Sequence, residues 1–358
     1  MITGSFDEFR VVHLSDLHFT GRPISEMTSK FWKHFHLDSI SLINLRLLLS
    51  DILLMQPNHI IITGDITNTA HPVEFQKAKE WLLDLQSKLW PGSLGVNDLH
   101  PDHFTIVPGN HDISRKPDLF GFRRRKSETS RLKLFMETFG STLGIDNRNT
   151  YDYSLSFPSY KKLFDCIDVF SLNSTVNIPV EVVGLNASGE IGTTQMIRLA
   201  ELFNKHCLEP SHFRIVLCHH HPLIIPYKQE SDIVEYFMAM RDASRLLRVC
   251  FDYGTHLLLH GHKHVPFVWS NQIVPAIDPP HQMTVVCAGS ATHERTGSSQ
   301  VYNQYIAIRK RIGKRFFIEK VNMGTRQYDP RTQSFREAGP PIVLYQQEQS
   351  DDRRRFQD

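Results

Sequence analysis

The stretch Val107-Pro108-Gly109-Asn110-His111-Asp112 follows the short apolar run 103–107, which predicts a buried strand. Pro108 and Gly109 end that strand in a sharp turn. Three polar side chains therefore follow the carboxyl end of a strand, where ligands bind in open α/β sheets. An amide, an imidazole and a carboxylate are costly to bury without partners. The stretch indicates a metal site with a proton donor beside it, although a turn with a capping Asn explains it equally well when it is taken alone.

The composition predicts a globular protein that is not secreted. Of the 358 residues, 41% are hydrophobic and 22% charged, which suffices for one large α/β domain or two smaller ones. The five cysteines are scattered without C-x-x-C spacing and indicate reduced thiols. Residues 1–10 lack the pattern of a signal peptide, and no apolar run has the length of a membrane span. We expect a soluble cytoplasmic protein, at most peripheral to a membrane.

Four more apolar segments, 9–15, 58–63, 213–218 and 255–259, predict strands that end in polar residues. The groups that follow them are Asp16-Leu17-His18, Gly64-Asp65, His219-His220-His221-Pro222 and His260-Gly261-His262-Lys263-His264. Strand alternation would place Asp16 and His18 on one side. Each group alone has an ordinary explanation as a turn or as surface residues. Together, the five indicate one shared site, whose carboxylates, imidazoles and amide suit Mn²⁺, Fe or Zn²⁺ in a hydrolytic centre.

The rest of the chain alternates helices with strands. Periodicity predicts helices over 39–55, 73–90, 189–206 and 233–250, and a strand over 164–172 that ends at Asn173-Ser174. Segments 283–287, 302–309 and 315–321 are expected to be strands of a second sheet, and the loop 288–293 could line the pocket. We expect one domain over 1–338 and a disordered tail over 339–358. The basic segment 115–133 is interpreted either as a solvated, partly helical excursion or as a lid over an anionic substrate.

These motifs and the strand–helix alternation resemble the calcineurin-like metallophosphoesterases, and within them the branch of bacterial cyclic-nucleotide and other small phosphodiesterases. The resemblance spans Asp16 to His264 and implies a four-layer αββα sandwich of two mixed sheets with a dinuclear metal centre. It implies that the first metal is held by Asp16, His18, Asp65 and His264. It implies that the second is held by Asp65, Asn110, His262 and one histidine of the 219–221 run. The family's spacing before proline favours His220, and alignment from the strand side favours His219.

The resemblance also implies the reaction, in which a metal-bridging hydroxide attacks phosphorus. His111 would stand beside the leaving group as acid or hydrogen-bond donor, and Asp112 would orient His111. We expect a phosphodiester substrate, a cyclic nucleotide or a similar small phosphate ester, without a nucleic-acid partner. The oligomeric state is left open.

Three alternatives accompany this expectation. A pyrophosphatase of a lipid-linked nucleotide, such as UDP-2,3-diacylglucosamine in lipid A synthesis, is suggested by Trp32, Phe35, His36 and the Arg cluster 123–125. A DNA repair nuclease is disfavoured by the net charge of +2 and by the lack of a long basic extension. A metal-free scaffold is disfavoured because every ligand position of the pattern is filled.

Overall fold

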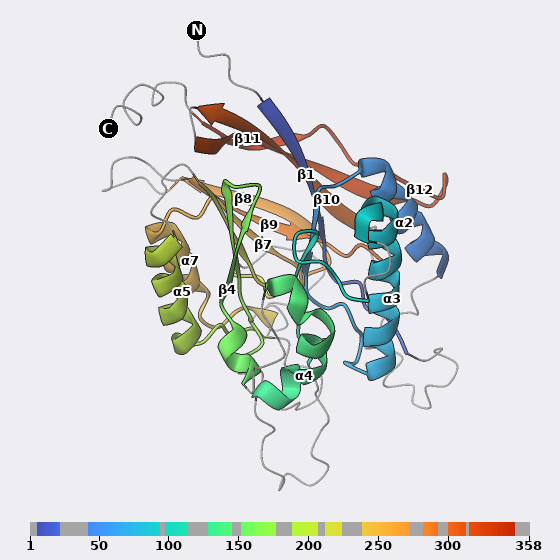
Figure 1. The fold of residues 1–358 in the computed structure, drawn as a ribbon, viewed down its shortest axis with the longest axis horizontal. Helices are drawn as coiled ribbons and strands as arrows, with labels where there is room; N and C mark the ends of the chain where they lie inside the picture. Colours follow the sequence, from blue (N-terminus) through green and yellow to red (C-terminus); the bar gives the residue numbers. More distant parts are fainter. Residues whose placement is uncertain are drawn as a thin grey trace, which may run out of the picture.

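Two mixed β-sheets lie at the centre of the computed structural model (Figure 1). The structure describes residues 6–21, 42–93, 97–113, 128–144, 152–176, 188–206, 212–223, 238–272, 282–292, 300–312 and 315–347. The first sheet has the strand order β12-β11-β10-β1-β2-β3, with β13 also paired to β11. The second sheet has the order β4-β5-β6-β7-β9-β8.

The first sheet contains β1 (Phe6–Leu14), β2 (His59–Thr63), β3 (Phe104–Val107), β10 (Val301–Ile312), β11 (Arg315–Asp329), β12 (Ser334–Glu337) and β13 (Ile342–Gln346). The second contains β4 (Ser159–Leu163), β5 (Ile167–Ser171), β6 (Phe213–Leu217), β7 (Leu257–His260), β8 (Pro266–Gln272) and β9 (Gln282–Ala288). The helices are α2 (Leu42–Met55), α3 (Pro72–Leu89), α4 (Glu128–Phe139), α5 (Thr193–His206) and α7 (Ala243–Asp252). No helix in the described part of the chain has the length and apolar character needed to cross a membrane.

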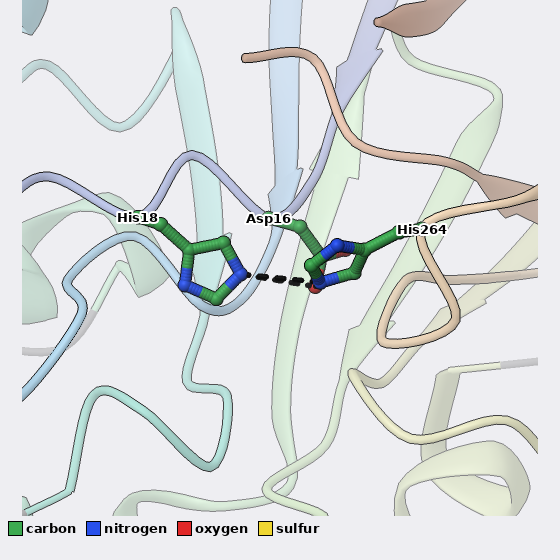
Figure 2. A group of neighbouring side chains, drawn as sticks. All are labelled: Asp16, His18 and His264. Carbon is green, nitrogen blue, oxygen red and sulfur yellow. Dashed lines mark hydrogen bonds and ion pairs between the residues drawn. The ribbon is translucent and has the colours of Figure 1, made fainter. Parts of the chain in front are cut away.

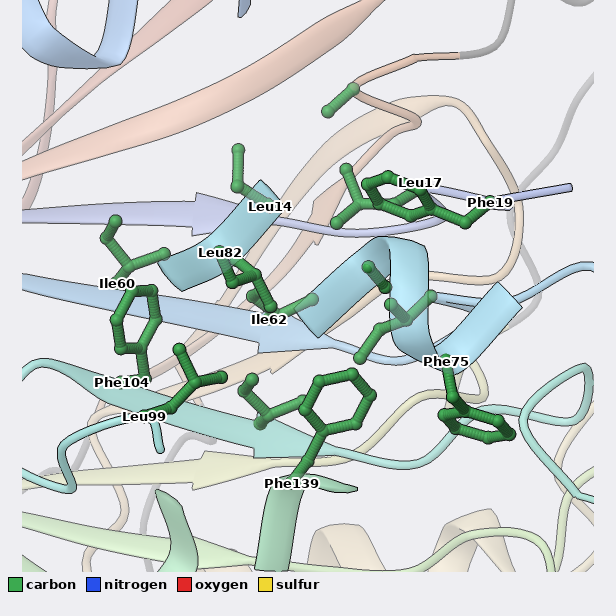
Figure 3. Packing of buried hydrophobic residues seen from close by; sticks show 14 of the residues in the cluster. Leu14, Leu17, Phe19, Ile60, Ile62, Phe75, Leu82, Leu99, Phe104 and Phe139 are labelled. Atoms are coloured by element: carbon green, nitrogen blue, oxygen red, sulfur yellow. The ribbon is translucent and has the colours of Figure 1, made fainter. Parts of the chain in front are cut away.

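Alternate residues of the central strands face opposite sides, which creates four layers. In β2, Ile60 and Ile62 belong to a core cluster on the outer face of the first sheet, whereas Ile61 belongs to the cluster between the sheets. In β6, Leu217 faces the first sheet, and Val216 packs in a third cluster with residues of α5 and α7. Figure 3 shows the outer cluster, where Ile62 and Leu14 lie beside Leu82 of α3. The three clusters therefore separate helix, sheet, sheet and helix layers, which confirms the predicted αββα sandwich.

The parallel strands set the position of the site. In the first sheet β1, β2 and β3 are parallel, and in the second β5, β6, β7 and β9 are parallel. These strands are nearly continuous apolar runs, as expected where both faces of a parallel sheet are covered. Their carboxyl ends bring the polar groups that follow them to one edge.

Several predicted elements differ from those observed. The predicted strands 302–309 and 315–321 belong to the first sheet, because β10 pairs antiparallel with β1. A hairpin of β4 and β5 replaces the single strand predicted over 164–172, with its turn at Phe164 and Asp165, both of which have positive φ. The apolar pattern identifies a strand but not the strand it pairs with.

The structure also differs from the predictions of a helix over 233–250 and of a disordered tail. The helix α7 begins at Ala243, after a break in which Met240 donates to the His221 carbonyl, and residues 233–237 of the predicted helix lie outside the described residues. Residues 339–347 are ordered, since β13 pairs with β11, so the predicted disorder is wrong for that part. Residues 128–133 of the basic segment begin α4. Its residues 115–127 and the aromatic stretch around Trp32 lie outside the described residues.

Candidate metal centre

All the predicted ligands except His220 meet in neighbouring groups where the two sheets face each other. Asp16 and His18 follow β1, Asp65 follows β2 and Asn110 follows β3. Histidines that follow β6 and β7 of the second sheet complete the set. Three groups of potential ligand atoms arise among the described residues, namely Asp16/His18/His264, His18/Asp65/His111 and Asp65/His219/His262. Since these groups share members, they form one continuous centre.

Asp16, His18 and His264 make the first half of the centre (Figure 2). The Nε2 atoms of His18 and His264 face each other at 3.2 Å, and His264 Nε2 lies 3.1 Å from Asp16 Oδ1. His18 Nε2 is 3.8 Å from the same carboxylate oxygen. All three side chains are almost fully buried. Three donor atoms therefore point at one small volume.

The second half of the centre surrounds Nε2 of His219. This nitrogen lies 3.2 Å from Asp65 Oδ2, 3.1 Å from Asn110 Oδ1 and 3.2 Å from His262 Nδ1. These residues come from four different strand ends and are all buried. The second half has the four donors that the family resemblance implies, with His219 as the histidine of the run.

Asp65 joins the two halves. The backbone N–H of His111 donates to its Oδ1 at 2.7 Å, which turns Oδ2 toward His219. Asp65 is also grouped with His18 of the first half. Burial raises the pKa of Asp65, but the neighbouring His219 and His111 more than offset this and hold the pKa well below its usual value. Asp65 is therefore an anion placed between two clusters of imidazoles.

The hydrogen bonds of the two adjacent histidines distinguish their roles. His219 Nδ1 donates to the Thr63 carbonyl at 2.7 Å, because a carbonyl only accepts. Its Nε2 therefore faces the centre and is the nitrogen that would offer its lone pair to a metal, as is typical of a metal-ligating histidine. His220 Nδ1 lies instead 2.8 Å from Ser174 Oγ. Of the two histidines left open by the sequence, the geometry favours His219 as the ligand.

The distances between the donor atoms match those expected around a bound metal ion. With metal–ligand bonds of about 2.0–2.2 Å, neighbouring donors of one ion lie about 3–3.5 Å apart, and the distances around His219 Nε2 are 3.1–3.2 Å. Without an ion, burial lowers the pKa of His219, but the neighbouring Asp65 more than offsets this and raises it to about 9, so Nε2 carries a proton that a metal ion would replace. In addition, the buried Asp16 Oδ1 has no hydrogen-bond partner. A cation among these atoms would take the place of that proton and bind the imidazole and the carboxylates together.

The backbone of the ligand loops has an unusual conformation. Asp16, His18, Asp65, His262 and His264 have φ values of 54°, 47°, 51°, 75° and 57°, all in the left-handed region. Each such residue costs about 1–2 kcal/mol, and such strain gathers at functional sites. The prediction that Asp16 and His18 lie together is confirmed, but the reason differs. The strand ends at Leu14, and left-handed turns, rather than strand alternation, bring the two side chains together.

Two glycines allow the ligand loops to approach closely. A Cβ on Gly109 would lie 2.2 Å from Asp65 Oδ1, so the turn after β3 can pack on Asp65 only without a side chain. A Cβ on Gly261 would lie 1.7 Å from Ser15 Oγ and 2.6 Å from Asp16 Oδ2. The approach also lets the His262 N–H donate to Asp16 Oδ2 at 3.0 Å. Glycine at 109 therefore permits a close contact between two loops of the first sheet, and glycine at 261 permits the contact between the two sheets.

His111 lies at the edge of the centre, and Asp112 supports it differently from the expectation. His111 Nε2 is 4.0 Å from Asp65 Oδ2, and its side chain is 27% exposed. Its Nδ1 donates to the Asn68 carbonyl at 2.7 Å. The Asp112 carboxylate accepts the N–H groups of Ile66, Thr67 and Gly109. The predicted orientation of the His111 imidazole by Asp112 is therefore corrected, because Asp112 fixes the two loops and the Asn68 carbonyl orients the ring.

Hydroxyl groups that the sequence did not single out hold the first ligand loop. Ser290 Oγ donates to the Asp16 carbonyl at 2.8 Å, and Thr292 Oγ1 donates to the Leu17 carbonyl at 2.8 Å. Both residues follow β9, in the loop expected to line the pocket. The sequence could have indicated these two residues, because they follow the end of a further strand, β9, as the ligands follow theirs. His293 of that loop lies outside the described residues.

Comparisons with known proteins were made with curated sequences and with solved structures. A search of curated proteins finds no match. Among solved structures, a purple acid phosphatase from yellow lupin (Lupinus luteus) seeds is similar, with a TM-score of 0.50, 11% identity, and coverage of 90% of this chain and 52% of that protein. This chain thus spans about half the length of the lupin enzyme. A predicted phosphoesterase from Streptococcus pneumoniae matches at a TM-score of 0.32 and 12% identity, over 94% of this chain and 97% of that one.

A family comparison covers most of the chain. The model of the calcineurin-like phosphoesterases matches residues 9–266. This range includes every residue of the two ligand groups described above, from Asp16 to His264. The chain therefore belongs to the calcineurin-like phosphoesterase family.

Proposed function

We propose that the protein is a dinuclear metal-dependent phosphoesterase that hydrolyses a phosphodiester, either a cyclic nucleotide or a similar small phosphate ester. The observation that carries this proposal is that Asp65 is grouped with His18 of the first half and with His219 and His262 of the second, with His111 beside them. Bound metal ions, Mn²⁺, Fe or Zn²⁺, would act as Lewis acids toward the phosphoryl oxygens and would lower the pKa of bound water.

The protein's own residues would hold and orient these ions. Asp16, His18 and His264 would bind the first ion, and Asn110, His219 and His262 would bind the second, with Asp65 contributing to both. The Thr63 carbonyl fixes the proton of His219 on Nδ1. Because the backbone N–H of His111 holds Asp65 Oδ1, the same loop carries a ligand support and a proton donor.

His111 would provide the proton for the leaving oxygen. Its Nδ1–H donates to the Asn68 carbonyl, so Nε2 carries a proton only in the doubly protonated ring. In that state the ring donates at Nε2, on the side of Asp65. After the transfer, the neutral ring keeps the same bond to Asn68, and its orientation is preserved.

Of the alternatives, the lipid-linked substrate stays a prediction and the metal-free scaffold is disfavoured. The residues that suggested a lipid-linked nucleotide, Trp32, Phe35, His36 and the Arg cluster 123–125, lie outside the described residues. A metal-free scaffold would not require carboxylates and imidazole lone pairs to converge. We therefore retain the small phosphodiester as the proposed substrate.

Two substitutions test the proposed roles. We expect His111→Ala to retain two metals per chain and to lose turnover by about 10²–10⁴-fold, the usual contribution of an acid or base. Asp65→Ala should lose metal as well as activity, because it removes a ligand of both clusters. Metal content by elemental analysis and hydrolysis of bis-p-nitrophenyl phosphate with Mn²⁺ would distinguish the two variants. His100→Ala, a partly exposed histidine away from the centre, serves as the matched control.

The proposal would be contradicted if His111→Ala and Asp65→Ala had the same metal content and the same activity. A panel of cyclic nucleotides, nucleotide-sugar lipids, DNA and p-nitrophenyl phosphate would then rank substrates. Activity on DNA alone, or on monoesters alone, would overturn the proposed phosphodiester class.

A further inference from the structure

A buried serine of the second sheet contacts the ligand loop at its backbone. Ser174 follows β5 and is fully buried. Its Oγ accepts the N–H groups of His219 at 3.3 Å and His220 at 3.1 Å. The same oxygen lies 2.8 Å from His220 Nδ1. One hydroxyl therefore makes three contacts with the turn that carries the candidate ligand His219.

The direction of each hydrogen bond follows from the capacity of a hydroxyl, which has two lone pairs and one proton. The two N–H groups occupy both lone pairs of Ser174 Oγ. Its proton is left to donate to His220 Nδ1, so His220 carries its own proton on Nε2. The ring is confined as well, because a Cβ on Gly189 would lie 2.4 Å from His220 Cβ, and the His262 ring packs on it with centroids 4.6 Å apart.

This arrangement matters because the strand pairing stops just before the ligand. Cys218 N–H donates to the Leu259 carbonyl, and the next two N–H groups go to Ser174. Orphaned backbone donors in a buried turn would cost about 1–3 kcal/mol each. The orientation of this peptide sets the direction in which the His219 side chain leaves the backbone and reaches Asp65 and Asn110.

Ser174 is itself held in place from α5. The Asn173 N–H donates to Gln195 Oε1 at 2.8 Å, and Gln195 Nε2 donates back to the Asn173 carbonyl at 2.8 Å. Gln195 also donates to the Ile191 carbonyl at 3.0 Å. A continuous path of hydrogen bonds therefore runs from the outer helix through the loop after β5 to the ligand turn.

We propose that Ser174 is a positioning residue for the second half of the metal centre: its hydroxyl fixes the peptide of His219 and the tautomer of His220. The proposal rests on the proposed dinuclear function and extends it to a strand end that carries no ligand. Ser174 acts through His219 and touches neither metal nor substrate.

Metal binding measures this role directly. We expect Ser174→Ala to bind the second metal about 10- to 100-fold more weakly, the usual cost of losing an outer partner of a ligand, and to keep the first. Calorimetric titration with Zn²⁺ and elemental analysis would report both sites. Ser174→Thr retains the hydroxyl and should bind the second metal close to the wild-type level. Ser156→Ala is the matched control, because Ser156 is also buried and its hydroxyl has no hydrogen-bond partner in the described structure.

Unchanged affinity for the second metal in Ser174→Ala would overturn the inference, and so would an equal loss in the Ala and Thr variants, which would assign the effect to packing. If Ser174→Ala fails to fold, a measurement on the wild-type protein still tests the inference. Two-bond ¹H–¹⁵N spectra of the Zn²⁺-loaded protein, labelled at histidine, should show His220 protonated at Nε2, and a proton on its Nδ1 would contradict the inference. A wild-type protein that binds fewer than two metals would instead overturn the proposed dinuclear function.

Discussion

Two imidazoles of the centre, those of His219 and His111, are oriented by a hydrogen bond from Nδ1. For His219 the Thr63 carbonyl takes the Nδ1 proton, and for His111 the Asn68 carbonyl does the same. In both cases the acceptor is a backbone carbonyl just before or after Asp65. The short segment from Thr63 to Asn68 therefore supplies one ligand, the Asp65 carboxylate, and also sets the direction of two imidazoles. This explains why the segment must hold a left-handed residue at Asp65 despite its energetic cost.

Gly261 offers a test at the same scale. A Cβ there would collide with Ser15 Oγ and Asp16 Oδ2, so Gly261→Ala must push apart the loops that carry Asp16 and His262. We expect a folded protein, destabilised by about 1–3 kcal/mol as is usual for overpacking, with weakened binding of the first metal. Metal titration and urea unfolding would measure both effects.

Gly92→Ala is the control for this substitution, since a Cβ at Gly92 would meet nothing within 4 Å. Full metal occupancy with wild-type affinity in Gly261→Ala would show that the contact between the loops is not needed for the centre.

At the scale of the element, β4 is attached to the first sheet by one buried amine. Lys161 Nζ lies 2.5–3.0 Å from four acceptors, the carbonyls of Pro101, Phe104 and Thr142 and Thr105 Oγ1, which share its three protons. Burial lowers the pKa of Lys161 to about 7. The side chain thereby links the edge strand of the second sheet to the start of β3.

The lowered pKa of Lys161 leads us to expect that the free energy of unfolding depends on pH. In the unfolded chain the amine keeps its proton up to about pH 10, whereas in the folded protein it loses it near pH 7. Between these values the unfolded chain binds more protons, so the free energy of unfolding rises with pH. The difference in this free energy between wild type and Lys161→Met should therefore grow between about pH 7 and pH 10, by an amount on the order of a few kcal/mol.

The Met variant of the exposed Lys88, which pairs with Asp84 on α3, provides the control for removal of a lysine. Urea unfolding at several pH values measures all three proteins. A constant difference for Lys161→Met would mean that Lys161 keeps its proton in the folded state.

The elements also show what the sequence predicts and why. Buried parallel strands such as β2 and β6 are short apolar runs, and the polar residues that follow them mark the site, so both could be located. An apolar run does not show which strand it pairs with. For this reason β10 was predicted in the second sheet, although it pairs with β1 of the first. The left-handed turn at Asp16 and the choice of His219 over His220 depend on tertiary hydrogen bonds, which a linear pattern does not contain.

At the scale of the whole molecule, the candidate centre joins the two sheets. Asp16, Asp65 and Asn110 extend from the first sheet, whereas His219 and His262 extend from the second. Direct contacts between the sheets here are polar, such as the His262 N–H to Asp16 Oδ2 and the Ser290 hydroxyl to the Asp16 carbonyl. Ions bound between these groups would hold together two layers whose buried imidazoles otherwise face one another.

Metal should therefore stabilise the entire fold rather than only the loops. A ligand that binds the folded state alone adds RT ln(1 + [L]/Kd), about 4 kcal/mol at a free concentration 1,000 times Kd. We expect Mn²⁺ to raise the urea midpoint of the wild-type protein and EDTA to lower it, with KCl at matched ionic strength having little effect. His111→Ala should keep this gain and Asp65→Ala should lose it, because only the second removes a ligand shared by both clusters. Equal midpoints with Mn²⁺ and with EDTA in the wild-type protein would show that no metal bridges the sheets, and would remove the basis for hydrolysis at this edge.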